Sequence, residues 1–409
     1  MTAALRNYLI ITGNYWAFTI TDGAIRMLVV LHFYQMGYSP FAIAMLFIFY
    51  EVFGIVTNFV GGWLGARIGL NRTMQVGTAM QIVALLMLTA PNPMLTVVYV
   101  MAAQALSGIA KDLNKMSAKA GVKLVAGESD EQLFKWVAWI TGSKNALKGI
   151  GFFVGAALLA LIGFQGANLA LALLLVLGLI ATFTLPSGLG AMKEKARFSA
   201  LFSQDASINW LAAARIFLFG ARDVWFVVAL PVYLVSIGWD FEWVGAYLAL
   251  WVVGYGIVQA SAPRLLRGQK NPVGAETALL WSLILVGTPA LIWIGFQFNL
   301  PPGWLITIGL GVFGAVFAIN SAVHSYLILN YSSRDKASMN VGFYYAANAG
   351  GRLLGTVLSG YAYQTIGIEG CLLISTGFIA LAAVFTYQMT RSLKAKMAQL
   401  ALSHSKIDT

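Results

Sequence analysis

The sequence predicts an all-α membrane protein in which twelve transmembrane helices form two pseudo-symmetric bundles of six. Three observations predict this fold: an apolar composition, basic residues confined to alternate loops, and a repeat that relates the two halves. Of the 409 residues, 59% are hydrophobic and only 10% are charged. A soluble domain does not carry so much apolar sequence, so the chain is expected to cross the membrane many times.

Twelve apolar segments are long enough to span the bilayer. The first six cover residues 9–34, 41–66, 73–90, 94–118, 133–162 and 167–186. The second six cover residues 208–236, 243–266, 273–297, 304–330, 339–364 and 371–390. The predicted organisation is an N-terminal bundle at 1–186, a cytoplasmic linker at 187–207, and a C-terminal bundle with a short cytoplasmic tail at 208–409.

The positions of lysine and arginine predict the orientation. Connections after the odd-numbered spans carry neither residue, and their charged groups are Asp240, Glu242 and Glu369. Basic residues gather on the even-numbered side and in the tail: Arg67, Arg72, Lys119, Lys123, Lys193, Lys195, Arg197, Arg264, Arg267, Lys270, Arg334, Lys336, Arg391, Lys394 and Lys396. By the positive-inside rule, both termini are cytoplasmic. Topology therefore accounts for most of the net charge of +11, and no nucleic-acid partner is expected.

Cysteine and histidine are scarce, which argues against several kinds of chemistry. The single Cys371 cannot form an intrachain disulfide, and His32, His324 and His404 are scattered, so no metal site and no cofactor are expected. An intramembrane enzyme is disfavoured because the sequence lacks a serine–histidine–acid set, a paired-histidine motif and a phosphate loop. The N-terminus has one basic residue, Arg6, and no small-residue cleavage site, so the first apolar segment is expected to be retained.

Two patterns recur in the halves. At an offset of 201 residues the correspondences are Asp22 with Asp223, Gly37 with Gly238, Tyr38 with Trp239 and Asn58 with Gln259. At an offset of 204, Lys148-Gly-Ile-Gly151 corresponds to Arg352-Leu-Leu-Gly355. Together with the six-plus-six count, these matches predict a duplicated transporter with its site between the halves.

The stretch at 141–155 carries two lysines inside an apolar span. Lys144 and Lys148 are four residues apart and share one helix face. Lys144 lies ~16 Å into the span at ~1.5 Å per residue, too deep for its side chain to reach the surface of a core about 30 Å thick. The two ammonium groups therefore need a wet cavity, an acidic partner or an anionic ligand. Four glycines in the same stretch are expected to let a neighbouring helix approach closely: Gly142, Gly149, Gly151 and Gly155.

The end of the second span, Gly62-Trp-Leu-Gly-Ala-Arg-Ile-Gly-Leu-Asn-Arg72, resembles the loop 2–3 signature of the major facilitator superfamily. It departs from that signature at Gly65, where the superfamily usually has aspartate. This departure puts in question the charge contact by which the loop usually latches the two halves. The resemblance implies the superfamily's fold.

Longer strings over most of the chain resemble the organoarsenical efflux permeases (ArsJ type) of that superfamily. They are GNYWAFTITDGAIRMLVVLHF at 13–33, FYEVFGIVTNFVGGWLGARIGLNRTM at 49–74, QALSGIAKDLNKMSAK at 104–119, GSKNALKG at 142–149 and FLFGARDVWFVVALPVYL at 217–234. The resemblance implies export of 1-arseno-3-phosphoglycerate across the bacterial cytoplasmic (inner) membrane, giving arsenate resistance. It also implies a functional link to glyceraldehyde-3-phosphate dehydrogenase, whose reaction with arsenate makes that product. No residue roles follow from it.

In the superfamily's architecture, the first, fourth, seventh and tenth spans line a central cavity, with the fifth and eleventh beside them. The intramembrane polar residues of this chain concentrate on those spans, although burying one unpaired charge costs ~2.5–3.5 kcal/mol on insertion scales. The candidate substrate-binding residues are Arg26, Lys144, Lys148, Arg215, Arg222, Arg352, Lys111, Asn14 and Asn348. The candidate coupling or gating residues are Asp22, Asp223, Glu51, His324 and Arg67.

Cations outnumber acids in the expected cavity. Six basic residues stand against two acids, Asp22 and Asp223. Arginine binds phosphate, arsenate or carboxylate oxygens bidentately, while lysine supplies a point charge. The residues by themselves therefore predict a multiply anionic substrate.

Several candidates also have a structural interpretation. Asp22 and Arg26, one turn apart, either form a structural ion pair or serve transport. Arg222 and Asp223 are adjacent and are expected to point to different sides without pairing. Glu51 is expected to be a packing or gating partner.

The same holds for residues of the fourth, seventh and tenth spans. Arg215 reaches either water or the face of the bundle that carries Asp223. Lys111 and Lys115 either line the cavity or extend to the cytoplasmic end of their span. His324 is either a satisfied bundle histidine or a proton carrier.

Rival functions remain open at this point. An uptake or exchange carrier for organophosphates or other organic anions would have a similar cavity. A non-transporting membrane scaffold or receptor would bind a ligand without moving it. Protection of cells against arsenate separates export from uptake, and vesicle flux separates a transporter from a receptor.

Overall fold

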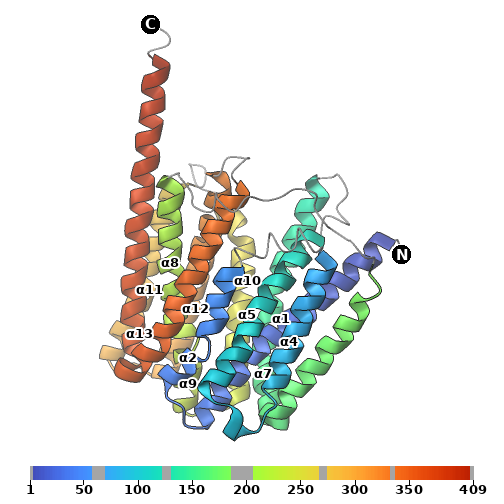
Figure 1. The fold of residues 1–409 in the computed structure, drawn as a ribbon. Coiled ribbons are helices and arrows are strands. Elements are labelled where there is room, and N and C mark those ends of the chain that lie inside the picture. Colours follow the sequence, from blue (N-terminus) through green and yellow to red (C-terminus); the bar gives the residue numbers. More distant parts are fainter. Residues whose placement is uncertain are drawn as a thin grey trace. The chain divides into compact units, whose positions relative to one another are not determined.

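The computed structural model describes residues 3–57, 70–121, 130–185, 206–266, 274–331 and 337–405, and secondary structure in these ranges is helical throughout (Figure 1). The helices of the N-terminal half are α1 (Ala3–Gln35), α2 (Pro40–Met45), α4 (Leu70–Met87), the 3-10 turn η1 (Asn92–Met94), α5 (Val97–Gly121) and α7 (Asp130–Thr182). Residues 48–57 are also helical. The later helices are α8 (Ala206–Phe226), α9 (Ala229–Ser236), α10 (Phe241–Leu265), α11 (Ala275–Gln297), α12 (Pro302–Asn330) and α13 (Ala337–Ser405).

Each of the twelve predicted spans falls mainly on helix among its described residues, with short non-helical stretches at 46–47, 88–90, 95–96, 183–185 and 227–228 and at residues 266 and 274. Within the described residues, eight helical stretches are long and apolar enough to cross a membrane, and two of these contain kinks. Loops were predicted at 163–166 and 365–370, and this prediction was wrong. The helices α7 and α13 continue through these residues and are interrupted by one non-helical residue each, Gly163 and Gly367. The last helix also continues to Ser405, beyond the predicted end at residue 390.

The repeat predicted from sequence recurs in the backbone. The four described glycines with positive φ form two pairs: Gly37 (81°) with Gly238 (94°), and Gly163 (71°) with Gly367 (69°). The first pair is 201 residues apart and the second 204, the same two offsets as in the sequence repeat. Positive φ at these values is readily adopted by glycine alone, so each half turns or kinks at equivalent places.

The chain divides into two compact units. The first unit comprises Met1–Ala196, Phe226–Gly256 and Thr356–Ile368, and the second comprises Arg197–Trp225, Ile257–Gly355 and Glu369–Thr409. The first unit thus includes α9 and parts of α10 and α13 together with the N-terminal helices. The predicted linker at 187–207 lies almost entirely outside the described residues, so the predicted domain boundaries remain a prediction.

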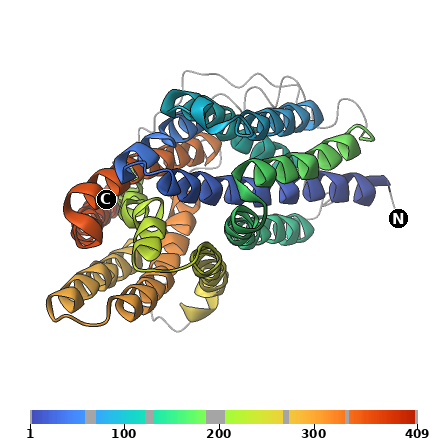
Figure 2. The same cartoon turned by 90° about the horizontal axis from the view of Figure 1, so that it is seen from below.

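In the first unit, α1 packs along α7, and α4 packs against α5 (Figures 1 and 2). Glycines permit the closest approach: a Cβ added at Gly151 would collide with the Ile20 carbonyl oxygen, and one at Gly155 with the Ala24 carbonyl oxygen. The predicted close approach of a neighbouring helix is therefore confirmed at these two positions. It brings Lys148 on α7 next to α1.

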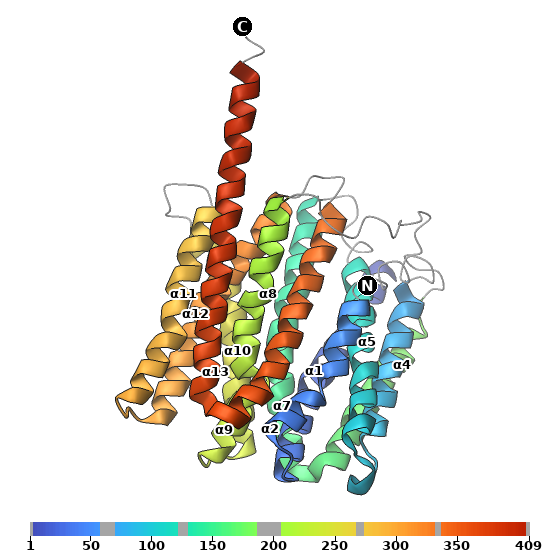
Figure 3. The same cartoon turned by 60° about the vertical axis from the view of Figure 1, so that its left-hand side comes forward.

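In the second unit, α13 packs against α8 by the equivalent contact, since a Cβ at Gly355, the counterpart of Gly151, would collide with the Gly220 carbonyl oxygen. Ser375 of α13 adds a hydrogen bond of 2.8 Å to the Ala221 carbonyl of α8. Helices α11 and α12 lie side by side (Figure 3). A buried apolar cluster that includes Ile208, Ile319 and Tyr344 joins helices of this unit.

Candidate functional site

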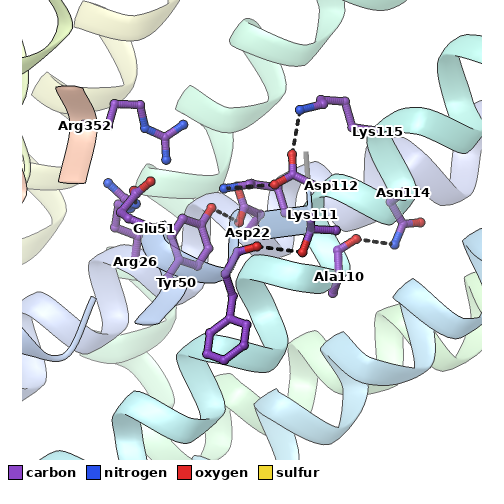
Figure 4. Close-up of polar contacts among 12 residues, drawn as sticks. Asp22, Arg26, Tyr50, Glu51, Ala110, Lys111, Asp112, Asn114, Lys115 and Arg352 are labelled. Carbon is purple, nitrogen blue, oxygen red and sulfur yellow. Dashed lines mark hydrogen bonds and ion pairs between the residues drawn. The ribbon is translucent and has the colours of Figure 1, made fainter. Parts of the chain in front are cut away.

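The first unit holds a buried carboxylate, Asp22 on α1, which groups from two other segments contact. Tyr50 Oη donates a hydrogen bond of 2.6 Å to Asp22 Oδ1 (Figure 4), and Lys148 Nζ on α7 lies 3.4 Å from Asp22 Oδ2. The Asp22 side chain is 6% exposed, and that of Lys148 is 22% exposed. Of the three environments open to Lys148, the structure therefore supplies an acidic partner.

Arg26 contacts a different carboxylate. Its Nη2 atom lies 3.0 Å from Glu51 Oε1 in the helical segment 48–57, and both side chains are buried. No ion pair joins Arg26 to Asp22 among the described residues, because the guanidinium extends across to the neighbouring segment. Glu51 thus packs against Arg26, and a contribution of this acid to gating stays a prediction.

Two cations approach the ring of Tyr50, which is itself buried. Lys111 Nζ lies 4.0 Å from the ring centroid and Arg26 Cζ lies 5.1 Å from it. Gly108 lets α5 come this close, since a Cβ there would collide with the Tyr50 carbonyl oxygen. The aromatic ring thereby contacts both cations through its face while its hydroxyl contacts Asp22.

A third buried carboxylate, Asp112 on α5, contacts two lysines of its own helix. Lys115 Nζ lies 2.6 Å from Asp112 Oδ1 and Lys111 Nζ lies 4.0 Å from Asp112 Oδ2 (Figure 4). The two lysine side chains are 23% and 16% exposed, respectively. Both lysines therefore belong to the polar cluster of the first unit, and Asp112 is a member that was not among the predicted site residues.

Lys144 is half-buried on α7, one helical turn before Lys148. Beside it, Trp16 Nε1 of α1 donates a hydrogen bond of 3.0 Å to Ser143 Oγ of α7. This contact fixes the part of α7 that carries Lys144 against α1.

Asn14 lies in a neutral network. Its Nδ2 atom donates to Thr78 Oγ1 at 2.9 Å and to Asn114 Oδ1 at 3.3 Å, so it joins α1 to α4 and α5. A mainly structural contribution follows from these contacts. The sequence did not distinguish this asparagine from the charged candidates on the same span.

The second unit contains a buried carboxylate at the equivalent place. Arg222 Nε donates to Asp223 Oδ1 at 2.6 Å, and Arg352 Nε on α13 lies 3.8 Å from Asp223 Oδ2. The expectation that Arg222 and Asp223 do not pair was wrong. The arginine side chain is long and flexible enough to fold back onto the next residue, and the buried carboxylate at 1% exposure favours that contact.

Arg215 on α8 is buried at 4% exposure and contacts α12. Its Nη1 atom donates to Ser321 Oγ at 3.1 Å, and its Cζ atom lies 3.9 Å from the ring centroid of Phe219 and 4.9 Å from that of Tyr344. Within the described part of the chain Arg215 has no ion pair with Asp223. The sequence left two expectations for Arg215, contact with water or with the face that carries Asp223. The structure shows neither, because the side chain is buried among Ser321, Phe219 and Tyr344.

His324 and Asn348 are the remaining candidates of the second unit. His324 is fully buried, and within the described part of the chain neither ring nitrogen has a hydrogen-bond partner. Its two interpretations, a satisfied bundle histidine and a proton carrier, both remain predictions. Asn348 is half-buried one turn before Arg352 on α13, and none of the described residues contacts its Oδ1 atom through a hydrogen bond.

Two features changed the site as it was read from the sequence. Glu51 and Asp112 are buried acids in addition to Asp22 and Asp223, so the count of two acids was too low. Tyr50 was missed as well. The available signal in the sequence was its place next to Glu51, an acid within the second span. Arg67 and Gly65 lie outside the described residues.

Apolar helices repeated in two halves, with charged groups buried within the spans of each, define a multi-pass membrane transporter. The sequence model described as Major Facilitator Superfamily matches residues 9–326, so the chain belongs to this superfamily. The predicted superfamily fold is thereby confirmed, and the protein is a secondary transporter. Among curated proteins, none matches this chain in sequence.

Solved transporter structures share the fold. A structure reported for proton-dependent oligopeptide transporters is 15% identical with a TM-score of 0.72, covering 96% of this chain and 98% of that one. A D-xylose–proton symporter is 13% identical with a TM-score of 0.71, covering 94% and 97%. The nucleoside transporter NupG, in a mutant form, is 13% identical with a TM-score of 0.72, covering 95% and 99%. At these identities the likeness concerns the fold alone.

Proposed function

We propose that this transporter exports a multiply anionic organoarsenical, 1-arseno-3-phosphoglycerate, by alternating access across the bacterial cytoplasmic membrane, and so gives arsenate resistance. Both termini are cytoplasmic in this proposal, as the loop charges predict. The observation that supports an anionic substrate is an excess of positive charge inside the membrane-spanning helices of both units.

The first unit has five basic residues within its described spans that are buried or half-buried, against three acids, which leaves a surplus of two positive charges. The bases are Arg26, Lys111, Lys115, Lys144 and Lys148, and the acids are Asp22, Glu51 and Asp112. Each acid contacts at least one of the bases. A ligand with negative charge compensates the surplus without any further protein group.

The second unit has the same surplus. Away from the ends and the kink of its described spans, it holds Arg215, Arg222 and Arg352 against the single acid Asp223. Three guanidinium groups supply planar, bidentate donors suited to phosphate and arsenate oxygens. A neutral sugar or nucleoside would leave these charges uncompensated, at a cost of several kcal/mol for each buried ion.

The narrower assignment to an organoarsenical is supported by the resemblance of the strings at 13–33, 49–74, 104–119, 142–149 and 217–234 to the organoarsenical efflux permeases. It also entails dependence on glyceraldehyde-3-phosphate dehydrogenase, the source of the substrate. In this proposal Lys148 and Arg352 bind the ligand's anionic groups, and Arg26, Lys111, Lys144, Arg215, Arg222, Asn14 and Asn348 assist. Asp22, Asp223, Glu51, His324 and Arg67 serve coupling or gating.

Resistance of an arsenate-sensitive bacterium tests the proposal. We expect protection against arsenate when the transporter and the dehydrogenase are expressed together, and no protection against arsenite. Uptake or exchange of organophosphates by the same fold gives no protection. Equal sensitivity of cells with and without the transporter, at verified expression, would rule out the export assignment.

A further inference from the structure

Arg215 is a buried cation for which the described part of the chain supplies no carboxylate. Its polar contacts are both with Ser321, to the hydroxyl at 3.1 Å and to the carbonyl at 3.4 Å. Its Nε atom is buried and has no hydrogen-bond partner among the residues that the structure describes. The rings of Phe219 and Tyr344 offset part of the charge through cation–π contacts, but they accept no hydrogen bond from Nε in the plane of the guanidinium.

His324 adds a second group with unmet hydrogen bonds. It lies three residues after Ser321 on α12 and so shares a helix face with it. The side chain is 0% exposed, and among the described residues neither ring nitrogen has a hydrogen-bond partner. In either neutral tautomer one of the ring nitrogens is an N–H donor.

Buried polar groups without partners in a native protein indicate a water molecule or an ion that completes their hydrogen bonds. The positive charge of Arg215 favours an ion over a water molecule at this place. Water would satisfy the donors but leave the guanidinium uncompensated, whereas an anion does both. Among the described acids of this unit only Asp223 is buried, and it contacts Arg222 and Arg352 and has no ion pair with Arg215.

We propose that Arg215, Ser321 and His324 form a buried anion site in the second unit, distinct from the contacts of Asp223. Its ligand is a small inorganic anion, a halide or a phosphate-sized oxyanion, that accepts hydrogen bonds from the Arg215 Nε, the Ser321 hydroxyl and the His324 N–H. The site requires an anion but not an arsenic compound. Because the proposed function also assigns Arg215 to the substrate, the inorganic anion occupies this site when no substrate is bound.

Thermal unfolding of the purified full-length protein tests the site. Chloride replaces gluconate at constant ionic strength in one series, and inorganic phosphate replaces it in a second, with no organoarsenical present. We expect a saturable rise of the unfolding midpoint with at least one of the two anions, because a ligand that binds only the folded state stabilises it. The series that saturates at lower concentration identifies the ligand as a halide or an oxyanion. A midpoint independent of both anions would overturn the proposal.

Variants localise the effect. Arg215→Leu removes the buried charge, so its midpoint should no longer respond to the anion. Arg391→Gln is the control, because it deletes a cation at an exposed position of α13, and it should keep the response. Ser321→Ala, a milder change in case Arg215→Leu fails to fold, should weaken the apparent anion affinity about tenfold. An unchanged anion response in either Arg215→Leu or Ser321→Ala would contradict the assignment.

Discussion

Lys148 Nζ lies 3.4 Å from Asp22 Oδ2, and the second unit repeats this pair as Arg352 and Asp223, whose Nε and Oδ2 atoms lie 3.8 Å apart. The acids are 201 residues apart and the bases 204, the offsets of the sequence repeat. Each duplicated half therefore joins equivalent helices through a carboxylate and a cation. In the proposed function, an anionic ligand competes with each carboxylate for its cation.

Removal of the Lys148 charge tests this competition. Lys148→Met removes the ion-pair partner of Asp22 and leaves the hydrogen bond from Tyr50, so we expect a loss of about 3 kcal/mol in stability as well as a loss of transport. In the double variant with Asp22→Asn, the unpaired charge is gone and stability should return. Flux should stay about a hundredfold below wild type if the lost ligand contact also contributes about 3 kcal/mol.

The measurement is flux into everted vesicles, normalised to folded protein, alongside thermal unfolding of each variant. A purely structural pair predicts that the double variant regains both stability and flux. Near-wild-type flux in the double variant would therefore refute ligand binding by Lys148.

Arg352→Lys keeps the charge near Asp223 but removes the planar guanidinium. We expect normal amounts of folded protein and a clear reduction of transport, because lysine does not bind an oxyanion bidentately. The control is Arg391→Lys, the same substitution at an exposed position of α13. Equal flux in the two variants would show that charge alone suffices at position 352.

Two substitutions of Tyr50 separate the contribution of its hydroxyl group from that of its aromatic ring. Tyr50→Phe keeps the ring beside Lys111 and Arg26 but deletes the hydrogen bond to Asp22, at a cost of about 1.5–3 kcal/mol for a bond to a charged group. Tyr50→Leu removes the ring as well. We expect Tyr50→Leu to unfold at a lower temperature than Tyr50→Phe, and identical midpoints would show that the cation–π contacts contribute nothing.

Asp223→Asn tests whether transport requires an ionisable group at this position. The substitution raises the positive surplus of the second unit, and an anion leaving a negative cytosol gains ~2.3 kcal/mol per charge per 100 mV. We expect some downhill flux to remain in vesicles with an imposed potential. Complete loss of flux with normal expression and binding would indicate obligatory proton coupling through Asp223.

Topology is testable with an impermeant thiol reagent on intact cells. The native Cys371 is buried, so the unmodified chain should give little background. Met94→Cys, at a position 56% exposed between the third and fourth spans, should label from outside, and Lys394→Cys in the last helix should not. Labelling of position 394 in intact cells would reverse the predicted orientation.

The sequence by itself determined the class of protein and the repeat that relates its two halves. Apolar spans and one-sided loop charges follow from the bilayer, which acts on each segment separately. The repeat likewise indicated Asp22, Lys148, Asp223 and Arg352 as equivalents, because offsets along the chain survive folding. Local patterns were therefore sufficient for the fold and for its duplicated design.

Only the tertiary structure decided which acid contacts which base. Arg26 lies one helical turn after Asp22 on α1, yet it forms its ion pair with Glu51 of another segment. Lys148 reaches Asp22 because glycines on α7 bring that helix against α1, and Arg222 folds back onto its own neighbour. Which carboxylate a long, flexible cationic side chain contacts depends on distance and burial in the folded protein. The spacing of residues along one helix specifies neither the distance nor the burial.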